Sequence, residues 1–248
     1  MLAPETVRAV DEFWAGELGV EPAALRPPAP AVLPRGDGSR GVHAMLFGAA
    51  APVATVSSAL SASSRARIAA AIASAFDDPA ALVAALEGEM ERVIGPATIR
   101  YADRGTFRPQ PPSPSVRMLT LDDAPAIERL RVACTATEWE HGGSDVREHP
   151  CAGAFAGDEI AALAGYEVWG GAVAHLSVVT HPAHRGRGHG AAAVSRIAAE
   201  ALERGLVPQY RTLESNAPSI AVAARLGFEP YARSLAVRPR RDASTISP

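Results

Sequence analysis

Lysine is absent from this sequence, and all 24 basic residues of the 248-residue chain are arginines. A P-loop needs a lysine beside the serine or threonine that ends its pattern, so nucleotide binding of that type is excluded. Cysteine is nearly absent too, and Cys134 and Cys151 do not have the spacing of a metal-binding pair. We therefore expect two free thiols in a reducing compartment.

Further absences disfavour several classes of partner. The net charge is −3 and the arginines do not cluster, so no surface for nucleic acid is expected. No apolar run reaches the length of a membrane span, and the first residues lack the basic and apolar segments of a signal peptide. The 48% hydrophobic and 21% charged fractions are typical of globular proteins. These features predict a cytoplasmic protein that binds neither a membrane nor nucleic acid.

Proline marks the clearest boundary in the chain. The stretch RPQPPSPS at residues 108–115 contains four prolines, which remove backbone donors and favour an extended, stiff linker. We predict an N-terminal α+β domain of unassigned role at 1–107, the linker at 108–115, a second domain at 116–238 and a disordered tail at 239–248.

The N-terminal region has periodic apolar patterns but no motif that indicates chemistry. Helical spacing in Pro4–Leu18 predicts a helix, and two apolar runs predict a hairpin of Val42–Phe47 and Val53–Val56. Two more helices are predicted at Ser64–Phe76 and Pro79–Val93, the second after the possible capping residues Asp77 and Asp78.

The region after the linker alternates strands and helices. A strand at 116–121 and a capped helix at 122–136 precede a three-stranded antiparallel meander over 154–180, with turns at Gly157–Asp158 and Gly170–Gly171. A helix to about Glu203, a strand at 206–215, a helix at 216–227 and a strand at 228–238 complete it. The predicted fold class is α/β with a mixed sheet (α+β).

A glycine-rich loop follows the meander, in the stretch HPAHRGRGHGAAAV at residues 181–194. Successive backbone N–H groups in such a turn converge on an anion, and the next helix adds the positive end of its dipole. The dinucleotide pattern G-x-G-x-x-A fits Gly186, Gly188 and Ala191, but it requires a strand–helix–strand unit rather than a meander.

A third loop type fits better. The pattern [QR]-x-x-G-x-[GA] matches Arg185, Gly188 and Gly190 and is preceded by Val-Val-Thr-His-Pro at a strand end. The pattern N-x-x-S-x-x-x-A-x-x-x-G-F occurs from Asn216 to Phe228. Together these resemble the two motifs of the GCN5-related N-acetyltransferase (GNAT) superfamily, over roughly residues 116–237. The first residues, up to about 110, resemble the extra N-terminal region of some two-domain members.

The resemblance implies an acetyl-CoA site without a metal. The coenzyme pyrophosphate would bind to the loop, and the pantetheine arm would pair with the end of the preceding strand. One amide of that strand would also polarise the thioester carbonyl. The last helix would contact the pantetheine arm. His181, His184 and His189 have no metal-ligand spacing. The implied cofactor-binding residues are Val178, Val179, Thr180, Arg185, Gly186, Arg187, Gly188, His189, Gly190, Ala191, Asn216 and Ser219.

The catalytic groups of the superfamily are not at their usual positions. Ala223 stands where many members carry a tyrosine acid, and the strand positions of a base are Ala174 and Leu176, with His175 between them on the other face. The stretch TEWEHGGSD at 137–145 would wall the acceptor pocket with negative charge, and Trp139 could stack on a substrate. The candidate bases are, in order, Glu140, Glu138, His141 and His175. Glu167 and Glu214 are further options, and Tyr210, Tyr231 or water could supply the acid.

The predicted function is direct transfer of an acetyl group from acetyl-CoA, in a ternary complex, to a primary amine. The acceptor would be a small cationic amine or a peptide amine, and the protein a monomer or homodimer. The alternative is a non-catalytic regulatory module that binds acyl-CoA.

Overall fold

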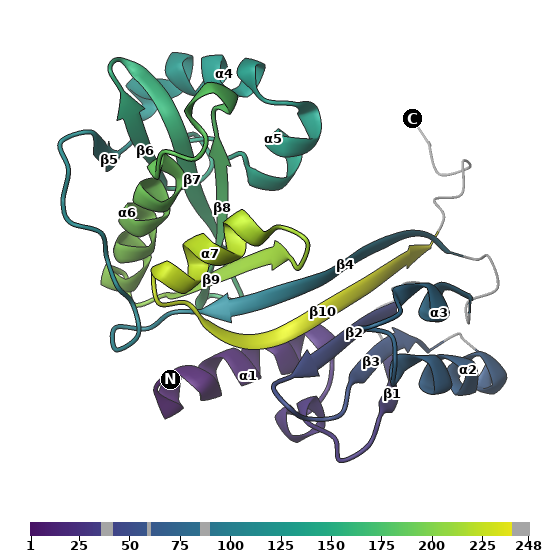
Figure 1. Cartoon of the computed structure of the whole chain (residues 1–248). Coiled ribbons are helices and arrows are strands. Elements are labelled where there is room, and N and C mark those ends of the chain that lie inside the picture. Colours follow the sequence, from purple (N-terminus) through teal and green to yellow (C-terminus); the bar gives the residue numbers. More distant parts are fainter. Residues whose placement is uncertain (36–41, 59–60, 85–89, 240–248) are drawn as a thin grey trace. The chain divides into compact units, whose positions relative to one another are not determined.

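The computed structural model describes residues 1–35, 42–58, 61–84 and 90–239, and they form two compact units (Figure 1). Unit 1 comprises Met1–Ala9, Arg100–Arg211 and Asn216–Glu229. Unit 2 comprises Val10–Ile99, Thr212–Ser215 and Pro230–Pro248. Among the described residues, no helix is long and apolar enough to cross a membrane.

Unit 1 is built on a mixed sheet with the strand order β9-β8-β7-β6-β5. All neighbours are antiparallel except β8 and β9, which are parallel. The predicted meander is confirmed as β6, β7 and β8, because β7 and β8 pair residue for residue around the turn at Gly170–Gly171. The strands are β5 (Val116–Met118), β6 (Cys151–Ala156), β7 (Glu159–Trp169), β8 (Val173–Thr180) and β9 (Val207–Leu213).

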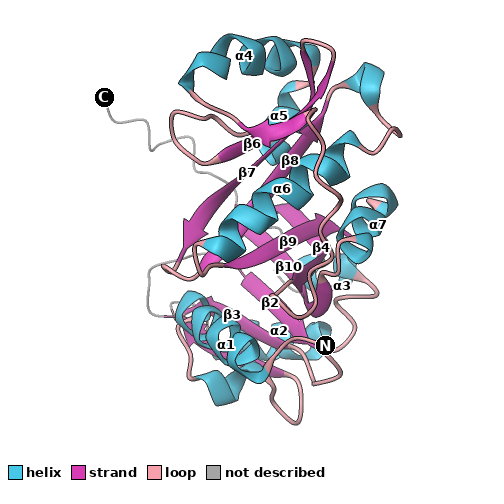
Figure 2. Cartoon of the chain, turned by 90° about the vertical axis from the view of Figure 1, so that its left-hand side faces the viewer, coloured by secondary structure: helices cyan, strands magenta, loops and turns pink. Residues whose placement is uncertain are grey.

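Helices cover both faces of this sheet (Figure 2). One core contains buried residues of β7, β8, α6 and α7, and many of them are alanines, which let helix and sheet approach closely. The opposite core joins the sheet to α4 and to Trp139 of α5. The helices are α4 (Ala124–Ala133), α5 (Ala136–Gly142), α6 (His189–Glu203) and α7 (Ala217–Arg225), with 3₁₀ turns η2 (Leu121–Asp123) and η3 (Pro182–His184).

The proline-rich segment 108–115 has neither helix nor strand, but it belongs to unit 1 and its backbone is bound to other parts of that unit. The amide of Arg108 donates to the Leu226 carbonyl at 2.9 Å, and that of Gln110 donates to Ser195 Oγ at 2.8 Å. The division of the chain at this segment into separately folding domains stays a prediction.

Unit 2 contains a second run of strands, in the order β1-β3-β2-β10-β4. The predicted hairpin is confirmed as β2 and β3, and α1 has the predicted bounds. A core of aliphatic residues joins β2, β3 and β10 to α2 and α3. The elements that lie wholly or mostly in unit 2 are α1 (Pro4–Leu18), η1 (Pro22–Leu25), β1 (Ala31–Arg35), β2 (Val42–Phe47), β3 (Val53–Ser57), α2 (Ala62–Ile72), α3 (Pro79–Ala84), β4 (Met90–Tyr101) and β10 (Glu229–Pro239).

Two features of unit 2 differ from the sequence prediction. The helix predicted at Pro79–Val93 is wrong at its end, because α3 stops at Ala84 and Met90 already belongs to β4. The β-branched residues in RVIGPATIR favour this strand, and β10 supplies its pairing partner. Strand β1 was not predicted, since it has five residues and contains Pro34, which only an edge strand tolerates.

The tail prediction falls on 239–248, of which 240–248 lie outside the described residues.

The Gly-Phe pair that ends the second motif has a structural role. Gly227 has φ 81° at the end of α7, and a Cβ there would overlap the carbonyl oxygen of Thr106. Phe228, beside it, is buried in the α6 core. The Gly-Phe pair therefore packs the end of α7 closely against Thr106 and the core of unit 1.

We expect Gly227→Ala to destabilise unit 1 by about 2–4 kcal/mol, from the left-handed backbone and the overlap together. In thermal unfolding this corresponds to a fall in Tm of roughly 5–10 °C. Gly157→Ala is the control, because Gly157 has φ 62° but no atom within 4 Å of a Cβ. Equal losses in the two variants would show that close packing on Thr106 contributes nothing.

Candidate functional site

The glycine-rich loop connects the end of β8 to the start of α6. Gly186 and Gly188 have φ values of 75° and 86°, a conformation that glycine adopts without strain, and Gly188 is the N-cap of the helix. No atom lies within 4 Å of a Cβ built on either residue. The space beside both glycines is therefore open.

The amides of this loop are available to a ligand. The first amide of the helix with a protein acceptor is that of Ala192, which donates to the Gly188 carbonyl at 3.1 Å. For the six amides from Gly186 to Ala191, no acceptor occurs among the described residues. Free N–H groups at the N-terminus of a 15-residue helix form an anion site.

The second part of the candidate site is a split in the sheet between β8 and β9. Parallel pairing between β8 and β9 covers only Val173–Val207, Ala174–Pro208 and His175–Gln209. Beyond His175, residues 176–180 pair with β7 on one side, and no strand among the described residues pairs with them on the other. Peptide groups at such an edge can bind an extended ligand, and Val178, Val179 and Thr180 lie in this part of β8.

Helix α7 lies beyond the split and begins at the second motif. The side chain of Asn216 caps α7 by accepting from the Ser219 amide at 3.2 Å. Ser219 Oγ in turn lies 2.9 Å from the hydroxyl of Tyr210 on β9. Burial raises the pKa of Tyr210, so its hydroxyl stays protonated at neutral pH.

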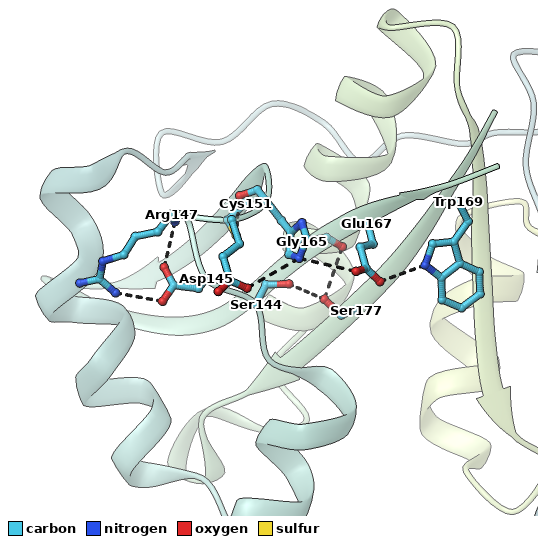
Figure 3. Close-up of polar contacts among 10 residues, drawn as sticks. Ser144, Asp145, Arg147, Cys151, Gly165, Glu167, Trp169 and Ser177 are labelled. Atoms are coloured by element: carbon cyan, nitrogen blue, oxygen red, sulfur yellow. Dashed lines mark hydrogen bonds and ion pairs between the residues drawn. The ribbon is translucent and has the colours of Figure 1, made fainter. Parts of the chain in front are cut away.

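The acceptor segment predicted at 137–145 forms α5 and the loop after it. The helix ends at Gly142, which is buried and packs so closely on β8 that a Cβ there would overlap the carbonyl oxygen of Val178. After it, Ser144 Oγ lies 2.7 Å from Ser177 Oγ on β8 (Figure 3). The predicted acceptor segment therefore contacts the same strand as the open edge.

The acidic residues of this segment have different surroundings. Glu138 accepts from the Thr135 amide and hydroxyl and from Arg185, which together lower its pKa. Asp145 is paired with Arg147 at 2.9 Å. Glu140 and His141 are exposed on α5. Two of the three acids predicted to form a negative wall are thus balanced by arginines.

His175 lies at the point where β8 and β9 separate. Its Nδ1 is 2.7 Å from Gln209 Oε1, and the Gln209 amide nitrogen donates to the Tyr101 hydroxyl. Its ring stacks on the Trp169 indole, with centroids 3.8 Å apart. The amide orientation assigned by this network places the imidazole proton on Nδ1 and leaves Nε2 as a base. Burial lowers the pKa of His175, so the ring is neutral at pH 7.

More polar groups lie on the same face of the sheet (Figure 3). The Trp169 indole donates to Glu167 at 2.9 Å, and His149 Nε2 lies 3.9 Å from Glu167. The Cys151 thiol is no nucleophile, because burial raises its pKa to about 12. A cleft of about 410 Å³ opens beside this group, lined by Ala124, Ile127, Glu128, Arg131, Trp139, Gly143, Ser144, Asp145, Arg147, Glu148 and His149.

Some of these residues were not candidates from sequence. Ser177 could have been found, because strand alternation puts it on the same face as His175. Gln209 could not, since the pairing of β8 with β9 has no local signature. Ser144 lies in the predicted acceptor segment but was not singled out, and His149 was missed, because their contacts with Ser177 and Glu167 join parts of the chain far apart in sequence.

Comparison with known proteins agrees with this geometry. Residues 116–228 match the family model described as the acetyltransferase (GNAT) family. This segment belongs to the GNAT acetyltransferases. No curated protein matches the sequence.

We call residues 116–228 the GNAT domain. Two solved structures are similar to part of the chain. A GNAT-family protein from Novosphingobium aromaticivorans DSM 12444 is 27% identical, with 62% of this chain and 69% of that chain covered and a TM-score of 0.50. A GCN5-related N-acetyltransferase from Kribbella flavida is 15% identical, with 66% and 65% covered and a TM-score of 0.49. The chain thus spans about two thirds of the length of these structures. The cosubstrate of the GNAT family is acetyl-CoA.

The remaining sequence candidates have other partners. Glu214 is bound to Arg233 at 2.6 Å, and the hydroxyl of Tyr231 donates to Asp11, all within unit 2. In the GNAT domain the rings of His181, His184 and His189 lie near one another, and His184 pairs with Glu159 at 2.9 Å. Within the described part of the chain, no group of three or more His, Cys, Asp or Glu residues could hold a metal ion.

For the loop of the GNAT domain, we expect Gly188→Val to abolish coenzyme A binding in calorimetric titration, because the side chain fills the open space beside the amides. Arg185→Ala should weaken binding by roughly threefold to tenfold, since most donors are main-chain groups. Gly205→Val is the control, because Gly205 has φ 76° at the other end of α6. A larger loss from Arg185→Ala than from Gly188→Val would contradict the main-chain site.

Proposed function

We propose that the GNAT domain transfers the acetyl group of acetyl-CoA directly to a primary amine, with His175 as the general base. The observation that carries this proposal is that His175 is the last residue of β8 that pairs with β9, directly before the open edge. His175 and Thr180 are five residues, or roughly 16 Å, apart along the strand. A pantetheine arm that extends along β8 from the glycine loop would bring the thioester to this region.

The groups of this chain then have separate roles. Gly186–Ala191 donate to the pyrophosphate, and the open edge of β8 pairs with the arm and stabilises negative charge on the thioester oxygen. His175 Nε2 accepts the proton of the attacking amine, while Gln209 holds the proton on Nδ1. The departing thiolate takes up a proton from Tyr210 or from water.

The acceptor we propose is a cationic amine, either small or part of a peptide. The cleft beside Ser144 has one more acid than arginines in its lining, and Glu167 and Glu140 add negative charge outside it. A protonated amine is attracted by such a surface before His175 removes its proton. Glu138 and Asp145 contribute less, because arginines balance them.

Glu140, first among the bases predicted from sequence, ranks below His175 in this proposal. It is exposed on α5, whereas His175 has a fixed tautomer and a place on the split strand. The alternative, a regulatory module that binds acyl-CoA without catalysis, is favoured by one observation. Ala223, at the position of the usual tyrosine acid, is fully buried in the core.

We expect coenzyme A to raise the Tm of the protein, since a ligand that binds only the folded state stabilises it. NADH should have a much smaller effect. With acetyl-CoA and a library of primary amines, thiol release should then identify the acceptor. Stabilisation by coenzyme A without thiol release for any amine would favour the regulatory module, and equal stabilisation by NADH would contradict the site.

We expect His175→Gln to lower turnover by roughly 10²–10⁴-fold while coenzyme A affinity stays unchanged. Because burial lowers the pKa of His175 below its ordinary 6.5, the neutral base is lost only as pH falls through that lowered value. The wild-type rate should therefore decline on the acid side, at a lower pH than for an ordinary histidine. His175→Gln should remove this decline.

The same pH profile of Glu140→Gln separates the two candidate bases. A large loss of turnover at Glu140, with His175→Gln at the wild-type rate, would reverse their order.

A further inference from the structure

The side chain of Arg185 connects the glycine loop to α5. Its Nη2 donates to Glu138 Oε1 at 2.6 Å, and its Nε donates to the Thr180 carbonyl at 3.4 Å. The Arg185 and Glu138 side chains are 49% and 36% exposed. The sequence placed these two residues in different sites, one for phosphate and one for the acceptor.

Glu138 is held in place on the other side. Its Oε2 accepts from the Thr135 amide at 2.9 Å and from the Thr135 hydroxyl at 3.0 Å, as part of a capping box. At its other end, α5 packs through Gly142 on the backbone of β8. The Glu138 carboxylate therefore has a fixed position beside Arg185, unlike most exposed side chains.

An anion in the loop changes the balance of this pair. Arg185 immediately precedes the free amides of Gly186–Ala191, so a diphosphate bound there competes with Glu138 for the guanidinium. A carboxylate beside a diphosphate is repelled by it. An exposed ion pair contributes only about 0.2–1 kcal/mol, so a bound substrate can break it.

We propose that the Glu138–Arg185 ion pair is a latch between α5 and the glycine loop, and that coenzyme A opens it on binding, when the diphosphate takes over the guanidinium. This inference rests on the function proposed above. The ion pair therefore lowers the affinity of the free protein for coenzyme A, because it must break before Arg185 can contact the diphosphate.

The test is calorimetric titration of coenzyme A into the wild-type protein, Glu138→Gln and Glu138→Asp. Gln removes the charge but suits the capping position, whereas Asp keeps the charge and withdraws it from Arg185. Both variants should bind coenzyme A roughly 2- to 5-fold more tightly than the wild type. Glu140→Gln, on the same helix, is the control for a general charge effect and should stay within about 1.5-fold.

Three results would overturn the latch. Weaker binding in both variants would show that the pair holds the loop in its binding shape. Unchanged binding would show that the ion pair has no part in coenzyme A binding. Tighter binding in Glu138→Gln alone would show that only the negative charge of Glu138, and not its contact with Arg185, affects the affinity. Melting curves without ligand, expected within about 2 °C of the wild type, check that α5 is intact. Absence of coenzyme A binding to the wild type would contradict the proposed function instead.

Discussion

The short parallel pairing of β8 with β9 is the constraint on which the rest of the GNAT domain depends. Three residue pairs join the strands, and the hydrogen bonds end at His175 and Gln209. The interruption leaves peptide groups of β8 open over the five residues that lead to the glycine loop. It also places Gln209 beside His175 and turns Tyr210 toward Ser219 of α7. One break in strand pairing thus sets the surroundings of both His175 and Tyr210 where the open edge begins.

Arginine determines how much negative charge the acceptor side presents. In a chain without lysine, Arg185 and Arg147 bind Glu138 and Asp145, while Glu167 pairs with the Trp169 indole and lies near His149. The guanidinium group suits such contacts because its planar donors match a carboxylate. The charge of the site therefore depends on where each arginine is engaged, which a count of acids in the sequence does not reveal.

Elements with strong local signals were predicted with accurate bounds. Helix α1 has an apolar stripe at helical spacing, and the meander has glycine turns that fix its register. The helix predicted to Val93 failed because strand pairing with β10 outweighed an ambiguous apolar run. Strand β1 was missed because five residues with a proline give no period to read.

The sequence by itself determined the GNAT motifs, the meander and the glycine loop, because each is written in residues close together in the chain. Tertiary structure alone decided that Glu138 binds Arg185, 47 residues away, and that His175 binds Gln209, 34 residues away. It also decided that Ser144 contacts Ser177, 33 residues away. The physical reason is that pKa, tautomer and charge depend on the neighbours of a side chain, and strand pairing and helix packing select those neighbours without a local signal.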